Sequence, residues 1–353
     1  MPVPLTQFRD ALLDLALSFL WRQWSALGVP GYDGGEDEVA VDPEALIAFT
    51  CSMARYDARL FDEAVDWIAA NDRHINAPRL KAMFAADGFS GARVLTAVAR
   101  SLARSAPSLK WKPLSNLAPP LAETESLFRN RDGSPLPEAG GPDLDFIQLG
   151  LRRAPLRLRG RARRFPADLP AARMLRMRAL LGVGARADIL CYLGCDREGH
   201  SHAIARRLRY SQKTVYDVLA DFECAGIVVS SRNGRERTYR LISRGAAGEL
   251  LPPGPTHRWV EWPALLAAVE ALWRGVDRAV RSGYGAPLAL SEAFLLVRGL
   301  TRAVNSIEGM PGSPEPPPNK EIEAYVALGV SVVDEVLRPH ILAGGWTHGP
   351  SIP

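Results

Sequence analysis

The chain has few of the features that mark secreted, membrane-spanning or metal-binding proteins. It contains four cysteines and six histidines in 353 residues, and no CxxC pair occurs, so a disulfide framework is not expected. No run reaches the eighteen or so uninterrupted apolar residues that a membrane span requires. The apolar segment 12–21 is interrupted and flanked by charged residues, and no secretory signal is recognisable. We therefore expect a cytoplasmic protein without membrane association.

The sequence motifs of the common enzyme classes are also missing. No GxGxxG fingerprint follows a strand, and no Walker A, HExxH or GxSxG motif occurs. The spacing Gly182-Val183-Gly184 is typical of a turn between helices, because no strand precedes it. We therefore expect neither a cofactor nor an enzymatic activity.

Lysine is scarce and arginine is abundant, with 5 Lys against 38 Arg and a net charge of +4. Ten arginines and a single acid, Asp168, lie between Arg152 and Arg178. Guanidinium groups pair bidentately with phosphate oxygens, so some of these arginines are candidates for contacts with nucleic acid. The alternative interpretation is a solvated run of charge.

The stretch Ser201–Val228 predicts a helix-turn-helix. A short helix carries apolar residues at Ile204, Ala205 and Leu208, and the chain then breaks. Ser211 caps a second helix, which ends before an apolar strand. This spacing of two short helices and a turn is typical of proteins that place the second helix in the major groove of DNA.

The second helix is predicted to have one apolar and one polar face. At about 100° per residue, one stripe carries the four apolar residues of the helix and forms its core face: Val215, Val218, Leu219 and Phe222. Polar residues near the start of the helix lie outside this stripe, on the face with which a recognition helix touches base edges. The predicted DNA-contacting residues here are Ser211, Gln212, Lys213, Thr214 and Tyr216.

A β-hairpin is predicted directly after this helix. The runs Ile227–Ser231 and Arg237–Ile242 flank Asn233-Gly234, the strongest short hairpin signal, and Ala185–Leu193 supplies a first core helix. This order resembles the winged helix-turn-helix transcription regulators of the ArsR and MarR type, over roughly residues 170–245. The resemblance implies DNA binding, with further contacts from the preceding helix, the turn and the wing: Arg206, Arg209, Arg232, Asn233, Arg235 and Arg237.

The remaining sequence is predicted to be helical, with one linker. Asp42-Pro43-Glu44 is a helix start, residues 113–144 are rich in Pro, Gly and acids, and the alternation Leu156–Arg159 suggests a short strand near the winged helix. Three helices are predicted at 262–281, 288–307 and 320–342. The predicted fold is mainly α, with an N-terminal helical domain (1–112), a linker (113–145), a winged helix-turn-helix domain with a basic lead-in (146–250) and a C-terminal helical domain (257–343).

Two cysteines raise the alternative of a metal or thiol sensor. Cys191 and Cys195 are four residues apart on the first core helix, and His200 and His202 follow. Some ArsR-type repressors hold soft metals in helices of this domain, which the resemblance makes relevant. Two thiolates supply only two of the four ligands of a tetrahedral zinc, however, and buried cysteines at a helix contact are common. We therefore predict no metal site.

Together these features favour a DNA-binding transcriptional regulator, most simply a repressor. A homodimer on double-stranded DNA is expected, because a palindromic site demands two-fold symmetry. The flanking helices would dimerise or receive a signal. Two alternatives are a DNA-binding antitoxin or defence-associated repressor that also holds a protein partner, and a winged-helix scaffold that binds protein without DNA.

Overall fold

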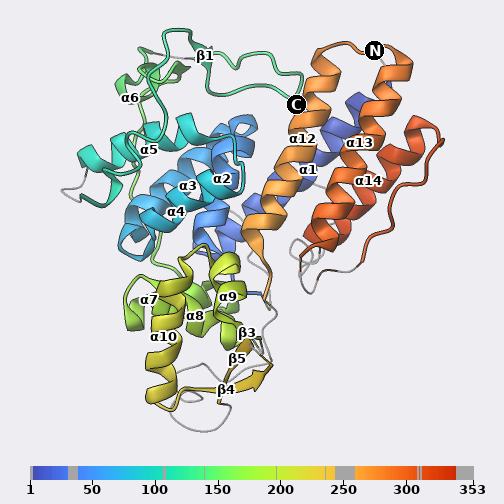
Figure 1. Cartoon of the computed structure of the whole chain (residues 1–353). Helices are drawn as coiled ribbons and strands as arrows, with labels where there is room; N and C mark the ends of the chain where they lie inside the picture. Colours follow the sequence, from blue (N-terminus) through green and yellow to red (C-terminus); the bar gives the residue numbers. More distant parts are fainter. Residues whose placement is uncertain are drawn as a thin grey trace.

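The computed structural model shows a mainly helical protein with 13 α-helices and a small amount of sheet in its described part (Figure 1). This confirms the expected mainly helical class. The boundary predicted at residues 251–256 lies outside the described residues. The structure describes residues 3–30, 39–105, 109–138, 140–195, 197–234, 236–242, 259–307, 310 and 312–338.

Polar caps start several of the N-terminal helices. The Asp42 carboxylate accepts hydrogen bonds from the backbone N–H groups of Glu44 and Ala45, both at 3.1 Å, which confirms the predicted helix start. Asn76 caps the fourth helix in the same way, by accepting from the N–H of Arg79. These helices are α1 (Val3–Ala26), α2 (Pro43–Met53), α3 (Ala58–Asn71), α4 (Ala77–Ala86) and α5 (Ala92–Ser105), with single turns η1 (Ala54–Tyr56), η2 (Asp72–His74) and η3 (Leu109–Trp111).

The C-terminal helices α12 (Trp262–Arg281), α13 (Ala286–Asn305) and α14 (Ile322–Leu337) share one hydrophobic core with the N-terminal helices. Figure 1 shows α1 lying against α12 and α14, which it contacts directly. The rings of Phe19 and Trp262 are 5.3 Å apart. The expected division into separate N- and C-terminal helical domains is therefore corrected to one helical body. None of the described helices is long and apolar enough to span a membrane.

The segment predicted as a linker is a long loop packed on this body. Strand β1 (Glu125–Ser126) pairs in parallel with β2 (Leu151–Arg152), and helix α6 (Leu144–Ile147) lies between them in sequence. The strand predicted at residues 156–159 is absent; the N–H groups at its two ends, of Leu156 and Arg159, donate to the carboxylates of Asp143 and Asp66 instead of to a strand. The Asp66 carboxylate accepts from the N–H groups of residues 159–162, at 2.7–3.0 Å.

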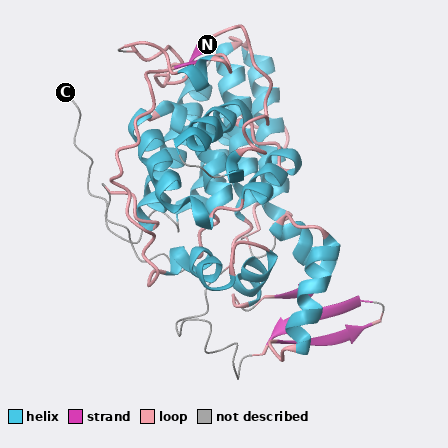
Figure 2. Ribbon diagram, turned by 90° about the vertical axis from the view of Figure 1, so that its left-hand side faces the viewer, coloured by secondary structure: helices cyan, strands magenta, loops and turns pink. Residues whose placement is uncertain are grey.

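A second, smaller core lies below the helical body in Figure 1 and defines a unit that we call the lower unit, residues 170–242. Its sheet has the strand order β3-β5-β4, all antiparallel, so one strand joins the predicted hairpin. Figure 2 shows α10 and the hairpin extending away from the helical body. The elements are η4 (Pro170–Ala172), α7 (Arg173–Leu181), α8 (Ala185–Leu193), β3 (Glu198–His200), α9 (Ser201–Leu208), α10 (Gln212–Cys224), β4 (Val228–Asn233) and β5 (Glu236–Leu241).

Candidate nucleic-acid interface

Helix α10 has one buried and one exposed face, as its apolar spacing predicted. The helix starts after Ser211, whose Oγ accepts a hydrogen bond from the backbone N–H of Thr214 at 3.1 Å. All four predicted core residues are buried, which confirms the register of the helix: Val215, Val218, Leu219 and Phe222.

The exposed face of the first two turns of α10 is polar. Gln212, Lys213 and Thr214 are exposed, and Tyr216 keeps 50% of its surface accessible. Lys213 Nζ lies 2.8 Å from Asp217 Oδ2, but an ion pair between two exposed groups stabilises little and exchanges readily. This half of α10 therefore presents an amide, an ammonium, a hydroxyl and a phenol, which can hydrogen-bond to base edges and phosphates, together with the Asp217 carboxylate, which repels phosphates.

The turn before α10 corrects one predicted contact. Arg209 ends α9 in the left-handed conformation, with φ of 60°. Its Nε donates to Asp87 Oδ2 at 2.8 Å, and its Nη1 lies 3.4 Å from Glu261 Oε1. The Arg209 side chain is only 11% exposed, so its charge is neutralised inside the protein and it is not available to DNA. Arg206, three residues earlier, is exposed and stays a candidate.

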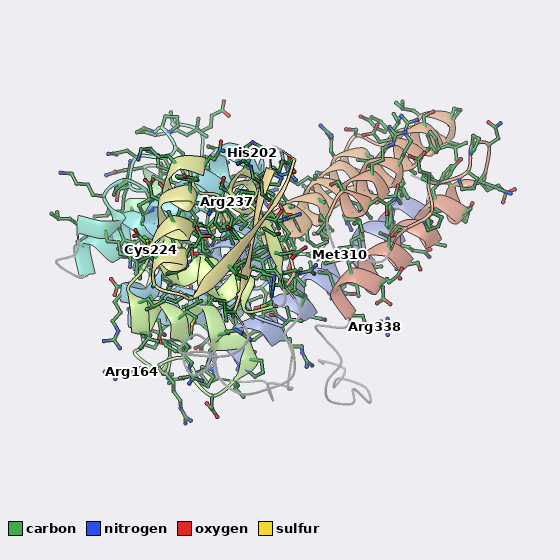
Figure 3. All side chains as sticks on the ribbon, turned by 60° about the horizontal axis from the view of Figure 1, so that its bottom comes forward. Arg164, His202, Cys224, Arg237, Met310 and Arg338 are labelled. Atoms are coloured by element: carbon green, nitrogen blue, oxygen red, sulfur yellow. The ribbon has the colours of Figure 1, made fainter. Side chains whose placement is uncertain are left out.

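The β4–β5 hairpin carries the predicted wing residues. Arg232 and Arg237 face each other in the antiparallel register, and Gly234 takes a φ of 61° at the turn. Arg232 and Arg237 are both exposed, and Arg237 pairs with Glu223 at 2.9 Å. Figure 3, which brings this end of the molecule forward, labels Arg237 on the hairpin. Arg235 and the side chain of Asn233 lie outside the described residues.

The arginine-rich segment 152–178 divides into buried and exposed members. Arg153, Arg173 and Arg178 are buried. Arg153 Nη1 lies 2.9 Å from Asp62 Oδ1, and Arg173 Nη2 donates to the carbonyl oxygen of Gly194 at 2.8 Å. These three arginines stabilise the fold and are removed from the candidate DNA contacts. The exposed members remain, and Figure 3 labels one of them, Arg164, at the edge of the view.

Arg178 belongs to a buried ion-pair network that joins the lower unit to the helical body. Its Nη1 and Nη2 donate to the two carboxylate oxygens of Glu44 at 2.7 and 2.8 Å. Its Nε and Nη2 donate to those of Asp188 at 2.8 and 2.9 Å. The side chains of all three residues are fully buried. Two bidentate pairs on one guanidinium fix α7 and α8 to the start of α2.

A second arginine continues this network to the helix-turn-helix. Arg79 Nη1 and Nη2 donate to the Asp42 carboxylate at 2.8 and 2.5 Å, and Arg79 Nε donates to the carbonyl oxygen of Leu208 at 2.8 Å. Tyr210 Oη donates to Asp188 at 2.6 Å and accepts from Asn76 Nδ2 at 2.8 Å. Burial alone would raise the pKa of Asp42, but Arg79 offsets this and lowers it below its usual value. The turn between α9 and α10 is thus held against the helical body.

No sequence signal beyond the helix starts indicated this network. Asp42 was recognised only as a helix start, and Arg178 only as part of a basic run. Its partner Glu44 is 134 residues away in the sequence. Sequence spacing indicates ion pairs only between residues three or four positions apart on one helix, so it could not indicate the pair between Arg178 and Glu44.

The cysteine pair is buried in the second core. Cys191 and Cys195 are 0% and 4% exposed, and Cys195 Sγ donates to the carbonyl oxygen of Cys191 at 3.3 Å. The contact with the second thiol and burial together raise the pKa of Cys191 well above its usual value. His200 Nδ1 accepts from the N–H of Ala203, as the cap of α9. Across the described residues, no three histidine, cysteine or acidic side chains gather as metal ligands.

Comparison with known proteins gives no match. No protein-family model matches the chain, and no match is found among the curated proteins or the solved structures. The function must therefore be inferred from the residues and their geometry.

Proposed function

We propose that the lower unit is a winged helix-turn-helix and that the protein is a DNA-binding transcriptional regulator. One observation carries this proposal: α10 buries its apolar stripe while Gln212, Lys213, Thr214 and Tyr216 stay exposed at its N-terminal half. In this proposal α10 enters the major groove and its first turns read base edges. The protein would act in the cytoplasm by occupying an operator, without catalysing a reaction.

Phosphate contacts in this proposal come from the helix start and the exposed arginines. The N-terminal end of α10 carries partial positive charge, which favours an adjacent phosphate. Arg206 and Arg232 are exposed on the lower unit and supply full charges. Arg237 is also exposed, and its pair with Glu223 is a surface ion pair that can exchange for a phosphate.

A homodimer is part of the proposal, because two copies related by a two-fold axis match a palindromic site. The buried Arg79 and Arg178 contacts bear on the geometry of such a dimer. They hold the α9–α10 turn against the helical body, so a dimer made through that body would set the spacing of its two recognition helices. Light scattering of the free protein and of its complex with duplex measures the stoichiometry.

The proposal is tested by selection from a pool of random duplexes, followed by fluorescence anisotropy on the enriched sequence and a scrambled one. Gln212→Ala should weaken binding to the enriched duplex by about 1–3 kcal/mol and leave the scrambled duplex almost unaffected. Lys213→Ala should also weaken binding to the enriched duplex. Its matched control is Lys112→Ala, which removes an exposed lysine of the helical body and should leave the affinity unchanged. Failure to enrich any sequence would refute sequence-specific recognition and favour the protein-binding scaffold.

Salt dependence separates phosphate contacts from base contacts. Arg232→Glu should weaken binding to all duplexes and make the slope of log K against log salt shallower by about 0.9 for each phosphate that the variant no longer neutralises. Arg278→Glu makes the same charge change on an exposed position of α12 and should leave the slope unchanged. An unaltered slope in the Arg232 variant would remove the hairpin from the interface.

A further inference from the structure

A cavity in the helical body, far in sequence from α10, is lined by an unusual concentration of arginine. Its volume is about 290 Å³, near the lower end of the range for small-molecule sites. It lies where α2, η1, the start of α5, the packed loop and α12 meet. Five arginines and a single acid, Asp277, line it: Arg55, Arg93, Arg129, Arg274 and Arg281.

Three of these arginines are held together by one carboxylate. Glu125 pairs with Arg93 at 2.5 Å, with Arg55 at 3.2 Å and also with Arg129. One negative charge therefore holds three guanidiniums side by side and neutralises only one of them. The N-terminal end of α5 adds partial positive charge, because Gly91 and Arg93 also line the cavity.

The other two arginines stand on α12. Arg281 Nε donates to Asp277 Oδ2 at 2.7 Å, and a Cβ at Gly133 would overlap the Arg281 guanidinium. Glycine at this loop position therefore lets the guanidinium lie against the backbone. Arg274 is exposed and has no hydrogen bond or ion pair within the described part of the chain. Arg274 thus makes no direct pair, although its charge partly offsets the burial that raises the pKa of the neighbouring Glu270.

The cavity also has an aromatic wall with unused hydrogen-bonding capacity. The rings of Tyr56 and Trp273 meet edge to face at 5.1 Å. Among the described residues, Trp273 Nε1 is a buried donor without a hydrogen-bond partner; Asp277 Oδ1 also has none, but as a carboxylate oxygen it would not pair with an anion. A buried donor without a partner costs free energy unless a ligand or water satisfies it.

We propose that this cavity binds a small organic anion, in which a carboxylate or phosphate group contacts the arginines and a flat apolar part packs on Tyr56 and Trp273. The excess of guanidinium over carboxylate selects a negative charge. The aromatic wall selects a ligand larger than a bare inorganic ion. The cavity volume limits that ligand to about the size of one ring with its acidic group.

The test uses calorimetry and thermal unfolding of the full chain with four probes: phenyl phosphate, benzoate, inorganic phosphate and benzyl alcohol. At least one of the two aromatic anions should bind with one-to-one stoichiometry and raise the unfolding temperature. Which of the two binds more tightly distinguishes a phosphate ligand from a carboxylate ligand. Benzyl alcohol, which lacks the charge, and inorganic phosphate, which lacks the ring, should bind more weakly than the better aromatic anion.

Two matched variants assign the binding to this cavity. Arg274→Gln should weaken the bound aromatic anion by about tenfold or more, the effect of removing one charge-assisted hydrogen bond. Arg278→Gln removes an exposed arginine one turn further along α12 that does not line the cavity, and should leave the affinity unchanged. Absence of binding by both aromatic anions, equally tight binding of benzyl alcohol or inorganic phosphate, or equal reductions in affinity in the two variants would each overturn the proposal.

Discussion

Replacing Arg178 by methionine tests whether the buried network holds the lower unit to the helical body. Methionine keeps the apolar stem of the side chain and removes the guanidinium, which donates to Glu44, to Asp188 and to the carbonyl oxygen of His74. Both carboxylates would then lack their bidentate partner at positions with no solvent access. We expect the free energy of unfolding to fall by about 3–5 kcal/mol, the usual effect of removing one member of a buried ion pair.

The magnitude is measurable by urea denaturation. With an m-value of about 3 kcal/mol per molar, a decrease of 3–5 kcal/mol lowers the midpoint by roughly 1–1.7 M. Arg176→Met is the matched control, because Arg176 lies on the same helix, is only half-buried and has no polar partner among the described residues. Its midpoint should change little. Equal midpoints for the two variants would refute a structural role for the network.

Three further predictions concern the core, the thiols and acid stability. Phe222→Ala should lower the free energy of unfolding by about 3–5 kcal/mol, because a buried ring is removed from the second core; near-wild-type stability by thermal unfolding would contradict the register of α10. A disulfide reagent should label only Cys224 in the folded protein, since Cys224 is exposed and the other three cysteines are buried; Cys224→Ser should abolish rapid labelling. Because Arg79 holds the pKa of Asp42 below its unfolded value, the contribution of Asp42 to stability is present above about pH 4 and is lost as the pH falls through the lowered pKa. Asp42→Asn should be less stable than wild type at neutral pH, and its free energy of unfolding, measured by denaturation at a series of pH values, should fall less steeply below about pH 4.

Much of the lower unit could be predicted from sequence, because its signals are local. The predicted helix Ala185–Leu193 is α8, although Cys195, which was placed on the same helix, lies beyond its end, and α10 begins directly after the predicted cap, Ser211. A capping hydroxyl and an apolar stripe act over three to eleven residues, so the chain encodes them without reference to distant segments. The exposure of Gln212 and Lys213 follows from the same local periodicity.

Only the tertiary structure shows which arginines are buried in ion pairs and which are exposed. Arg206 and Arg209 look alike in the sequence, yet Arg206 is exposed and Arg209 pairs with Asp87, 122 residues away. The same holds for the run before α7, where Arg178 is fully buried while Arg164 is exposed. Composition gives a guanidinium its charge, but only the fold brings a carboxylate close enough to neutralise it.

The shared core and the arginine-lined cavity depend on tertiary contacts in the same way. Apolar periodicity predicted α1 and α12 as helices but could not show that they pack on each other, because each stripe only requires some apolar partner. The cavity arises because α12, more than 200 residues after η1, brings Trp273 against Tyr56. The sequence alone determined where the helices begin and which of their faces are apolar. The tertiary structure decided which charges are neutralised and which remain exposed to bind a partner, because that depends on distances between segments far apart in the chain.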